Sequence, residues 1–334
     1  MKGRKKYFSK KLIWYVITLF VAIALNFFLP RAIPGNPVDV IVAKMTKGMS
    51  DTNSLKQIYD QVYAQFGFNK PLWLQFFQYI GNMFRGNLGV SISDFPQSVN
   101  SILASSLPWT IALQLPAILV SWILGNVLGA VAAYKKGVFD KVVFPVFLFL
   151  SCIPSFAFGL VLVWLFGIVL KVAPVGGGFG FDMSPNLSLP FFLSVLQHYQ
   201  LPFWSIVLVT IGGQSLGMRE MSIYETNSDY VKYSRLLGIR DSKIVKYVFK
   251  NAMLPQITGL ALSLGSMVGG ALVTEIIFSY PGIGTTMFNA ITNSDYTLTS
   301  GCTLIVTLTV LAANFIVDIL YGVIDPRIKA AQGD

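Results

Sequence analysis

Apolar residues gather into long runs separated by short polar segments, and this spacing is the first feature of the sequence. A helix of roughly 20 residues crosses about 30 Å of hydrocarbon, and six runs reach or approach that length. They cover residues 12–29, 109–133, 142–170, 201–216, 257–278 and 302–321. The pattern predicts an all-α, polytopic membrane protein with six transmembrane helices.

Two further apolar runs are shorter than a span. Residues 71–84 and 187–199 hold 14 and 13 residues, and both include glutamine. Runs of that length suit interfacial or core helices better than transmembrane helices. We therefore expect neither of them to cross the membrane.

The distribution of basic residues predicts the orientation, because cytoplasmic loops carry an excess of Lys and Arg. With six spans and a cytoplasmic N-terminus, 18 of the 25 basic residues lie inside, seven of them in the loop 218–253. If residues 71–84 also spanned, only 8 would lie inside. We therefore predict two cytoplasmic termini, a large outer segment over 31–106, and outer loops near 171–200 and 281–299.

Composition agrees with a membrane protein. Hydrophobic residues make up 54% of the 334 positions and charged residues 12%, whereas soluble domains carry about 25% charged residues. The net charge of +10 follows from the cytoplasmic loops, so we expect no nucleic-acid partner. The predicted organisation is a first span with an outer segment over 1–106, then a five-span core over 107–334.

Small residues within the runs predict close helix approach. They are Gly125 with Gly129, and Gly265 with Gly269 and Gly270.

Side chains that carry chemistry are scarce. Cys152 and Cys302 fall inside or beside apolar runs, and His198 is the only histidine, so we expect neither a disulfide nor a metal site. The motif G-x-x-x-x-G-K-[ST], which cradles nucleotide phosphates, is absent from the sequence. We therefore expect a transport subunit and not an enzyme, with no catalytic residue and no cofactor of its own.

Two acidic residues, Glu275 and Asp318, lie within or near the ends of the last two predicted spans. A charge at the bilayer centre costs about 2.5–3.5 kcal/mol on insertion scales, so such residues usually face other helices or a wet cavity. A helix-end or packing role is the simpler interpretation. The alternative is an ion-coupled secondary transporter in which both carboxylates carry a proton or a cation.

The cytoplasmic loop 218–253 contains two predicted amphipathic helices. The first begins near Ser228 or Asp229, residue types that cap helix N-termini, and ends at Gly238. The second begins at Asp241 and ends at Leu254-Pro255, because proline interrupts a helix. Its apolar stripe consists of Ile244, Val245, Val248 and Phe249.

Two short helices joined at a glycine form a projection that can insert into a groove on a partner. A basic loop that lies on anionic lipid is the alternative interpretation.

This loop resembles the ATPase-contacting loop of ABC importer permeases, whose consensus is Glu-Ala-Ala, three residues, Gly and later Leu-Pro. Gly238 occupies the glycine position, and residues 254–255 provide Leu-Pro. Residues 232–234 read Lys-Tyr-Ser instead of Glu-Ala-Ala. This departure is similar to the oligopeptide/dipeptide/nickel branch, where Asp-Tyr-Val, found here at 229–231, is usual.

Other stretches resemble the same branch, in the same order along the chain. They are Pro-Gly-Asn-Pro at 34–37, Phe-Gly-Phe-Asn-Lys-Pro at 66–71, Arg-Gly-Asn-Leu-Gly-Val-Ser at 85–91, Ser-Tyr-Pro-Gly-Ile-Gly at 279–284 and Asp-Pro-Arg at 325–327. The resemblance covers essentially the whole chain.

The resemblance implies a type I ABC importer permease fold in a prokaryotic inner membrane. It also implies half of a translocation pathway for oligopeptides, nickel or oligosaccharides, and the substrate stays open at this point. The implied partners are a second permease (a homologue or a second copy), two ATPase subunits that bind ATP and magnesium, an external solute-binding protein and membrane lipid. The residues that it assigns to ATPase coupling are Asp229, Tyr230, Lys232, Tyr233, Ser234, Arg235, Leu236, Leu237, Gly238, Ile239 and Arg240.

Overall fold

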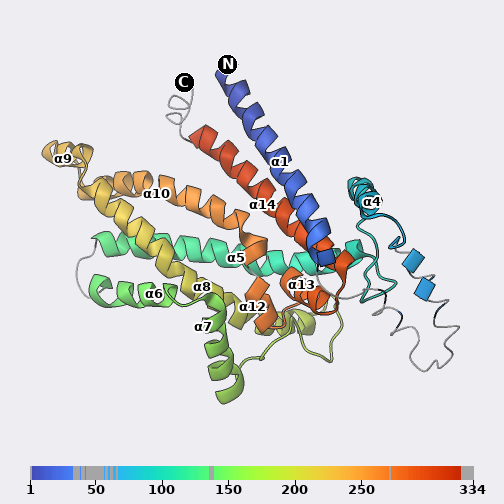
Figure 1. Cartoon of the computed structure of the whole chain (residues 1–334). Helices are drawn as coiled ribbons and strands as arrows, with labels where there is room; N and C mark the ends of the chain where they lie inside the picture. Colours follow the sequence, from blue (N-terminus) through green and yellow to red (C-terminus); the bar gives the residue numbers. More distant parts are fainter. Residues whose placement is uncertain are drawn as a thin grey trace. The chain divides into compact units, whose positions relative to one another are not determined.

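The computed structural model describes residues 2–32, 67–134, 139–270 and 272–324, with isolated positions between 38 and 64 (Figure 1). Side chains are described from residue 13 to residue 316 within these ranges, except at position 268. The motifs at 34–37 and 325–327 lie outside the described residues.

Most of the described residues are helical, and among the described residues the only β pairing is one isolated bridge between Val90 and Ser98. Four helices are long and apolar enough to cross a membrane. They are Ile13–Ala32, Val99–Tyr134, Leu189–Thr226 and Tyr296–Ile316. A bent helix pair would bring the number to five if it forms one span. The predicted all-α polytopic architecture is therefore confirmed.

The chain forms two compact units. The first holds Met1–Trp109, Pro281–Leu311 and Lys329–Asp334, and the second holds Thr110–Tyr280 and Ala312–Ile328. Helices α5 (Val99–Tyr134) and α14 (Tyr296–Ile324) each begin in the first unit and continue into the second.

In the first unit, α4 (Leu72–Phe84) packs against the C-terminal end of α1 (Lys2–Ala32) through aromatic rings. Phe27 is buried, and its ring centroid lies 5.2 Å from that of Phe76 and 5.5 Å from that of Tyr79. The structure thus confirms a helix in the short run 71–84, and its 13 residues are too few for a span. Helix α13 (Ile283–Thr292) completes the helical part of this unit.

In the second unit, α8 (Leu189–Thr226) contacts α6 (Phe144–Ser151), α7 (Ser155–Leu162) and α10 (Asp241–Gly265), as Figure 1 shows. Helix α8 also meets α5 closely. A Cβ added at Gly125 would lie 2.5 Å from the Cβ of Gln214, and one at Gly129 would overlap the carbonyl oxygen of Ser215. The prediction that these two glycines allow close helix approach is therefore confirmed.

The run 142–170, which we expected to form one span, is not one straight helix. Two helical pieces, Phe139–Ser151 and Ser155–Val169, meet at a bend of 104°. Pro154 lies at the bend with a ψ of 138°. Proline offers no N–H donor and disfavours helical backbone in the residue before it, so the chain turns here.

The run 257–278 is also interrupted. Helix α10 continues through Pro255 to Gly265, so the prediction that it ends at Leu254-Pro255 is wrong. Its neighbours stabilise it past the proline, because Trp122 Nε1 donates to the carbonyl oxygen of Gln256 at 2.9 Å. The helix then breaks at Ser266. Two short pieces follow, α11 (Met267–Gly270) and α12 (Leu272–Ile277), in a glycine-rich stretch of low helix propensity.

Two segments expected as outer loops contain helix. The run 187–199 and the span 201–216 merge into the single helix α8, whose N-cap Ser188 accepts a hydrogen bond from the backbone N–H of Phe191. Similarly, α13 and the start of α14 occupy most of 281–299. The Ser188 cap and Pro190 in the first turn favour the start of α8, and tertiary packing outweighs the helix-breaking tendency of Pro202 inside it.

We expect Gly125→Ala to lower the melting temperature of the purified chain, because overpacking a helix crossing costs about 1–3 kcal/mol. Gly213→Ala is the matched control, since Gly213 lies on α8 and an added Cβ meets nothing within 4 Å. Alanine there should be neutral or slightly stabilising, because it favours helix over glycine. Equal melting temperatures for both variants would contradict the close crossing.

Candidate functional site

The candidate site in the loop 218–253 begins with α9 (Asp229–Leu236), whose N-cap is Ser228. Gly238 follows the helix with a φ of +71°. Its N–H donates to the carbonyl oxygen of Arg235, and the N–H of Ile239 donates to that of Ser234, each at 3.0 Å. This pair of bonds is the Schellman motif, which closes a helix through a left-handed residue. The predicted helix boundary at Gly238 is confirmed.

Nothing lies within 4 Å of a Cβ built on Gly238. The requirement for glycine is therefore conformational and not steric, because a left-handed backbone disfavours any residue with a Cβ by about 1 kcal/mol or more.

A small apolar core fixes α9 against α10. Val231, Ile244 and Val248 are buried together, and Tyr230 and Ile239 pack against them. Two members of the predicted apolar stripe, Ile244 and Val248, thus face α9, whereas Val245 and Phe249 are partly buried and lie outside this core. Lys243, Lys246 and Lys250 are exposed on the other side of α10.

Glu225, in the last turn of α8, joins three helices. Its Oε2 accepts a hydrogen bond from the Tyr230 hydroxyl at 2.8 Å and lies 3.4 Å from the donating Nδ2 of Asn251 on α10. Ser228 Oγ donates to the backbone oxygen of Glu225 at 2.6 Å. Burial and the bond from the phenol to Glu225 raise the pKa of Tyr230, so its hydroxyl stays protonated and donates. Glu225 therefore fixes where α9 leaves α8.

The outer side of α9 carries apolar side chains in solvent. Tyr233, Leu236 and Leu237 are 67%, 81% and 79% exposed. The remaining exposed residues of the predicted coupling set are Asp229, Lys232, Arg235, Gly238 and Arg240, whereas Tyr230, Ser234 and Ile239 are partly buried. Exposed apolar clusters with a polar rim mark interaction surfaces, so this tip has the character of a docking surface.

A second interaction ties α8 to a neighbouring segment. Arg219 of α8 makes two bonds to Asp140, Nε to Oδ1 at 3.0 Å and Nη2 to Oδ2 at 3.3 Å. Its guanidinium carbon lies 5.0 Å from the ring centroid of Phe144. The pair ties α8 to the π-helical segment Phe139–Val143 that leads into α6.

The two acidic candidates are not brought into a common site by the described residues. Glu275 is fully buried in α12, beside Thr274, whose hydroxyl lies 3.4 Å from that of Ser155. Asp318 belongs to α14, and its side chain is outside the described residues. Over the part of the chain that the structure describes, no group of three or more His, Cys, Asp or Glu could hold a metal.

The first unit contains a buried carboxylate that was not predicted from the sequence. Asp295 caps α14 by accepting from the N–H of Leu298 at 2.8 Å. Its other oxygen accepts from the hydroxyls of Ser91 and Ser93 and from the N–H of Ser93. Asp295 is therefore a structural group that joins the stretch 85–91 to α14.

Residues 125–330 match the family of the binding-protein-dependent transport system inner membrane component. The chain belongs to this family. It is 33% identical to the di/tripeptide transport system permease protein DppB of Pseudomonas aeruginosa, over 97% of this chain and 98% of the relative. It is 32% identical to the oligopeptide transport system permease protein OppB of Haemophilus influenzae, over 97% and 99%. It is 31% identical to the dipeptide transport system permease protein DppB of Escherichia coli, over 94% and 96%.

The resemblance inferred from the loop and the ordered stretches is therefore confirmed. Arg219 and Asp140 were missed because they pair across 79 residues of sequence. Glu225 was missed because its bonds to Tyr230 and Asn251 depend on how three helices meet. The only sign of this role in the local sequence is that Glu225 stands three positions before Ser228, the cap of the next helix.

We expect Glu225→Ala to loosen α9, because it removes the acceptor of Tyr230 and Asn251. A hydrogen bond contributes about 1 kcal/mol, so hydrogen exchange of the α9 amides should become about fivefold faster. Glu220→Ala, an exposed carboxyl on the same helix, is the control and should leave these rates unchanged. Unchanged exchange in Glu225→Ala would mean that the apolar core alone fixes α9.

Proposed function

We propose that this chain is the permease subunit of an ATP-driven importer of short peptides, and that the tip of α9 docks on a separate ATPase. The observation that carries the proposal is the solvent-facing apolar cluster Tyr233, Leu236 and Leu237 on a helix fixed to α8 and α10. Membership of a binding-protein-dependent transport family supports the reading of this tip as a coupling surface.

Peptides are the proposed cargo because relatives that match almost the whole chain are named as di/tripeptide, dipeptide or oligopeptide permeases. Oligosaccharides and nickel, which the sequence left open, have no such support.

Coupling in this proposal is mechanical. ATP closes the paired ATPases, α9 moves with them, and the motion passes into the two helices that hold α9. Helix α8 has 38 residues and α10 has 25, and neither ends between the loop and the apolar region. Continuous helices move as rigid bodies, so α8 and α10 suit the transmission of a displacement at the tip.

The proposed assembly holds a second permease (a homologue or a second copy), two ATPases, and a solute-binding protein outside. ATP and magnesium belong to the ATPases, and this chain needs no cofactor of its own. The complex lies in a prokaryotic inner membrane with both termini of this chain in the cytoplasm.

Uptake by the reconstituted system tests the proposal. Vesicles that contain this chain and its partner subunits should accumulate a labelled tripeptide only with ATP and the ATPases. An ion-coupled transporter that uses Glu275 and Asp318 makes the opposite prediction, because its uptake would follow an ion gradient and survive without any ATPase. Such uptake would overturn the proposal.

The orientation is tested by thiol labelling. In a background where Cys152 and Cys302 are replaced by serine, Ser242→Cys, exposed at the start of α10, should react with an impermeant maleimide only from the cytoplasmic side. Ser184→Cys, exposed in the predicted outer loop, is the matched control and should react only from outside. Labelling of position 242 from outside would contradict the six-span topology.

We expect Gly238→Val to uncouple transport while insertion into the membrane stays near normal. Its cost of about 1 kcal/mol or more falls on the end of α9, so binding of the ATPase should weaken about fivefold or more and uptake should fall. Gly259→Val is the control, since its Cβ on α10 meets nothing within 4 Å and no left-handed backbone is required. Co-purification of the ATPase together with vesicle uptake measures both effects. Normal association with the ATPase and full uptake in Gly238→Val would mean that the loop is a solvated connector with no role in coupling.

A further inference from the structure

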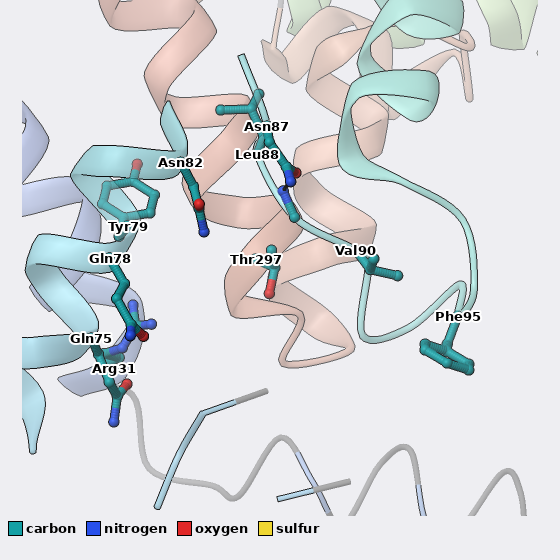
Figure 2. Close-up of a pocket in the computed structure, with 11 residues that line it drawn as sticks. Arg31, Gln75, Gln78, Tyr79, Asn82, Asn87, Leu88, Val90, Phe95 and Thr297 are labelled. Carbon is teal, nitrogen blue, oxygen red and sulfur yellow. Dashed lines mark hydrogen bonds between the residues drawn. The ribbon is translucent and has the colours of Figure 1, made fainter. Parts of the chain in front are cut away.

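A polar cavity of about 300 Å³ lies within the first unit (Figure 2). It is lined by Arg31, Gln75, Gln78, Tyr79, Asn82, Asn87, Leu88, Gly89, Val90, Phe95 and Thr297. This lining contains one cation, four carboxamides and no acidic side chain. With a cytoplasmic N-terminus, the C-terminal end of α1 and the whole of α4 face outward, on the side from which an importer receives its cargo.

Helix α4 gives the cavity its polar wall. Gln75, Gln78 and Asn82 recur three and four residues apart, so they share one face of the helix. Trp73 and Phe77 are exposed on the opposite face, which suits an interfacial helix with its apolar side in lipid. The polar face is thereby left to the cavity, and Figure 2 shows Arg31, Gln75 and Gln78 grouped on one side of it.

The guanidinium of Arg31 is held in place before any ligand arrives. It lies 3.7 Å from the centroid of the Phe27 ring, and its Nη1 donates to the carbonyl oxygen of Phe27 at 3.0 Å. A guanidinium fixed in this way presents its remaining donors as a planar fork that matches a carboxylate.

Two buried polar atoms of this cavity have no hydrogen-bond partner among the described residues. They are Nε of Arg31 and the hydroxyl oxygen of Tyr79. Burial raises the pKa of Tyr79, so its hydroxyl remains a neutral donor. Buried donors without acceptors are unfavourable, and an anion in the cavity would lie beside the guanidinium of Arg31 and compensate its charge. Since the lining offers a positive charge and no negative one, the ligand it suits is an anion.

We propose that this cavity binds the C-terminal carboxylate of a short peptide, with Arg31 on the carboxylate and the four carboxamides on the peptide amides. The peptide class rests on the proposed function, while the carboxylate follows from the cavity itself. A single cation suits one negative charge better than a phosphate dianion. Carboxamide side chains both donate and accept, as peptide groups do. The volume is at the lower end for ligand sites and suits one or two residues.

Binding to the full chain in phosphatidylcholine nanodiscs tests this. Calorimetric titration compares Ala-Ala-Ala with its C-terminal amide, in which a neutral carboxamide replaces the charged carboxylate. We expect the free acid to bind at least tenfold more tightly, as the loss of a charged hydrogen bond implies. Arg31→Gln should abolish the difference. Arg85→Gln, which removes an exposed arginine outside this lining, should keep it.

A second variant covers the case in which Arg31→Gln fails to fold. Gln78→Glu places a carboxylate beside Arg31 and leaves the contacts of Arg31 with Phe27 in place, so it should also remove the preference while gel filtration stays normal. Equal affinity for acid and amide in the wild type, no peptide binding, or a preference that survives in either folded variant would overturn the proposal.

Nanodiscs with phosphatidylglycerol test whether the anion that the cavity binds is a lipid headgroup instead of a peptide. Enrichment of phosphatidylglycerol that depends on Arg31, without any preference for the peptide acid, would overturn the proposal and assign the cavity to a lipid headgroup. ATP-dependent uptake by the assembled transporter is measured separately. If the transporter takes up peptide but the chain does not bind the free acid more tightly than the amide, only this inference is overturned. If the chain prefers the free acid but no uptake occurs, the cavity remains a carboxylate site and the proposed importer is overturned.

Discussion

The close contact of α8 with its neighbours is the interaction on which the second unit depends. Lipid tails are as apolar as side chains, so helices in a membrane associate through tight packing and hydrogen bonds instead of the hydrophobic effect. Gly125 on α5 and Gly212 on α8 provide this packing, since a Cβ at either position would overlap a neighbouring helix. The bond from Trp122 to the backbone of Gln256 then adds α10 to the same assembly.

The position of the loop that carries α9 follows from that packing. Helix α8 ends at Thr226, and Glu225 at its end accepts hydrogen bonds from α9 and α10. The Schellman turn at Gly238 returns the chain toward α10, and the apolar core closes the junction. The tip of α9 is thus held by α8, the helix that contacts α6, α7 and α10. A force on the proposed docking surface is therefore transmitted to packed helices.

The sequence allowed the helical class, the run lengths, the loop helix and its end at Gly238 to be predicted, because each depends on local composition or backbone conformation. The bend at Pro154 and the break at Ser266 were missed. The length of an apolar run does not show whether its helix is straight. A proline can lie between two helices, as Pro154 does before α7, or inside one helix, as Pro255 does in α10. Glu225 and Asp140 could not be found, since their partners are set by tertiary packing.

Two buried polar sites of the first unit, one around Asp295 and one around Arg31 and Tyr79, have different roles. The first has a structural role, and the second is the proposed ligand site. Asp295 accepts hydrogen bonds from Ser91, Ser93 and Leu298, so its charge is compensated within the protein. A carboxylate satisfied in this way holds two segments together and has little capacity for a ligand. Arg31 and Tyr79 instead keep donors without acceptors among the described residues. Arg31 is also the one cation in a lining that holds no acidic side chain. Its charge is therefore not compensated within that lining, and this is the feature on which the proposed carboxylate site depends.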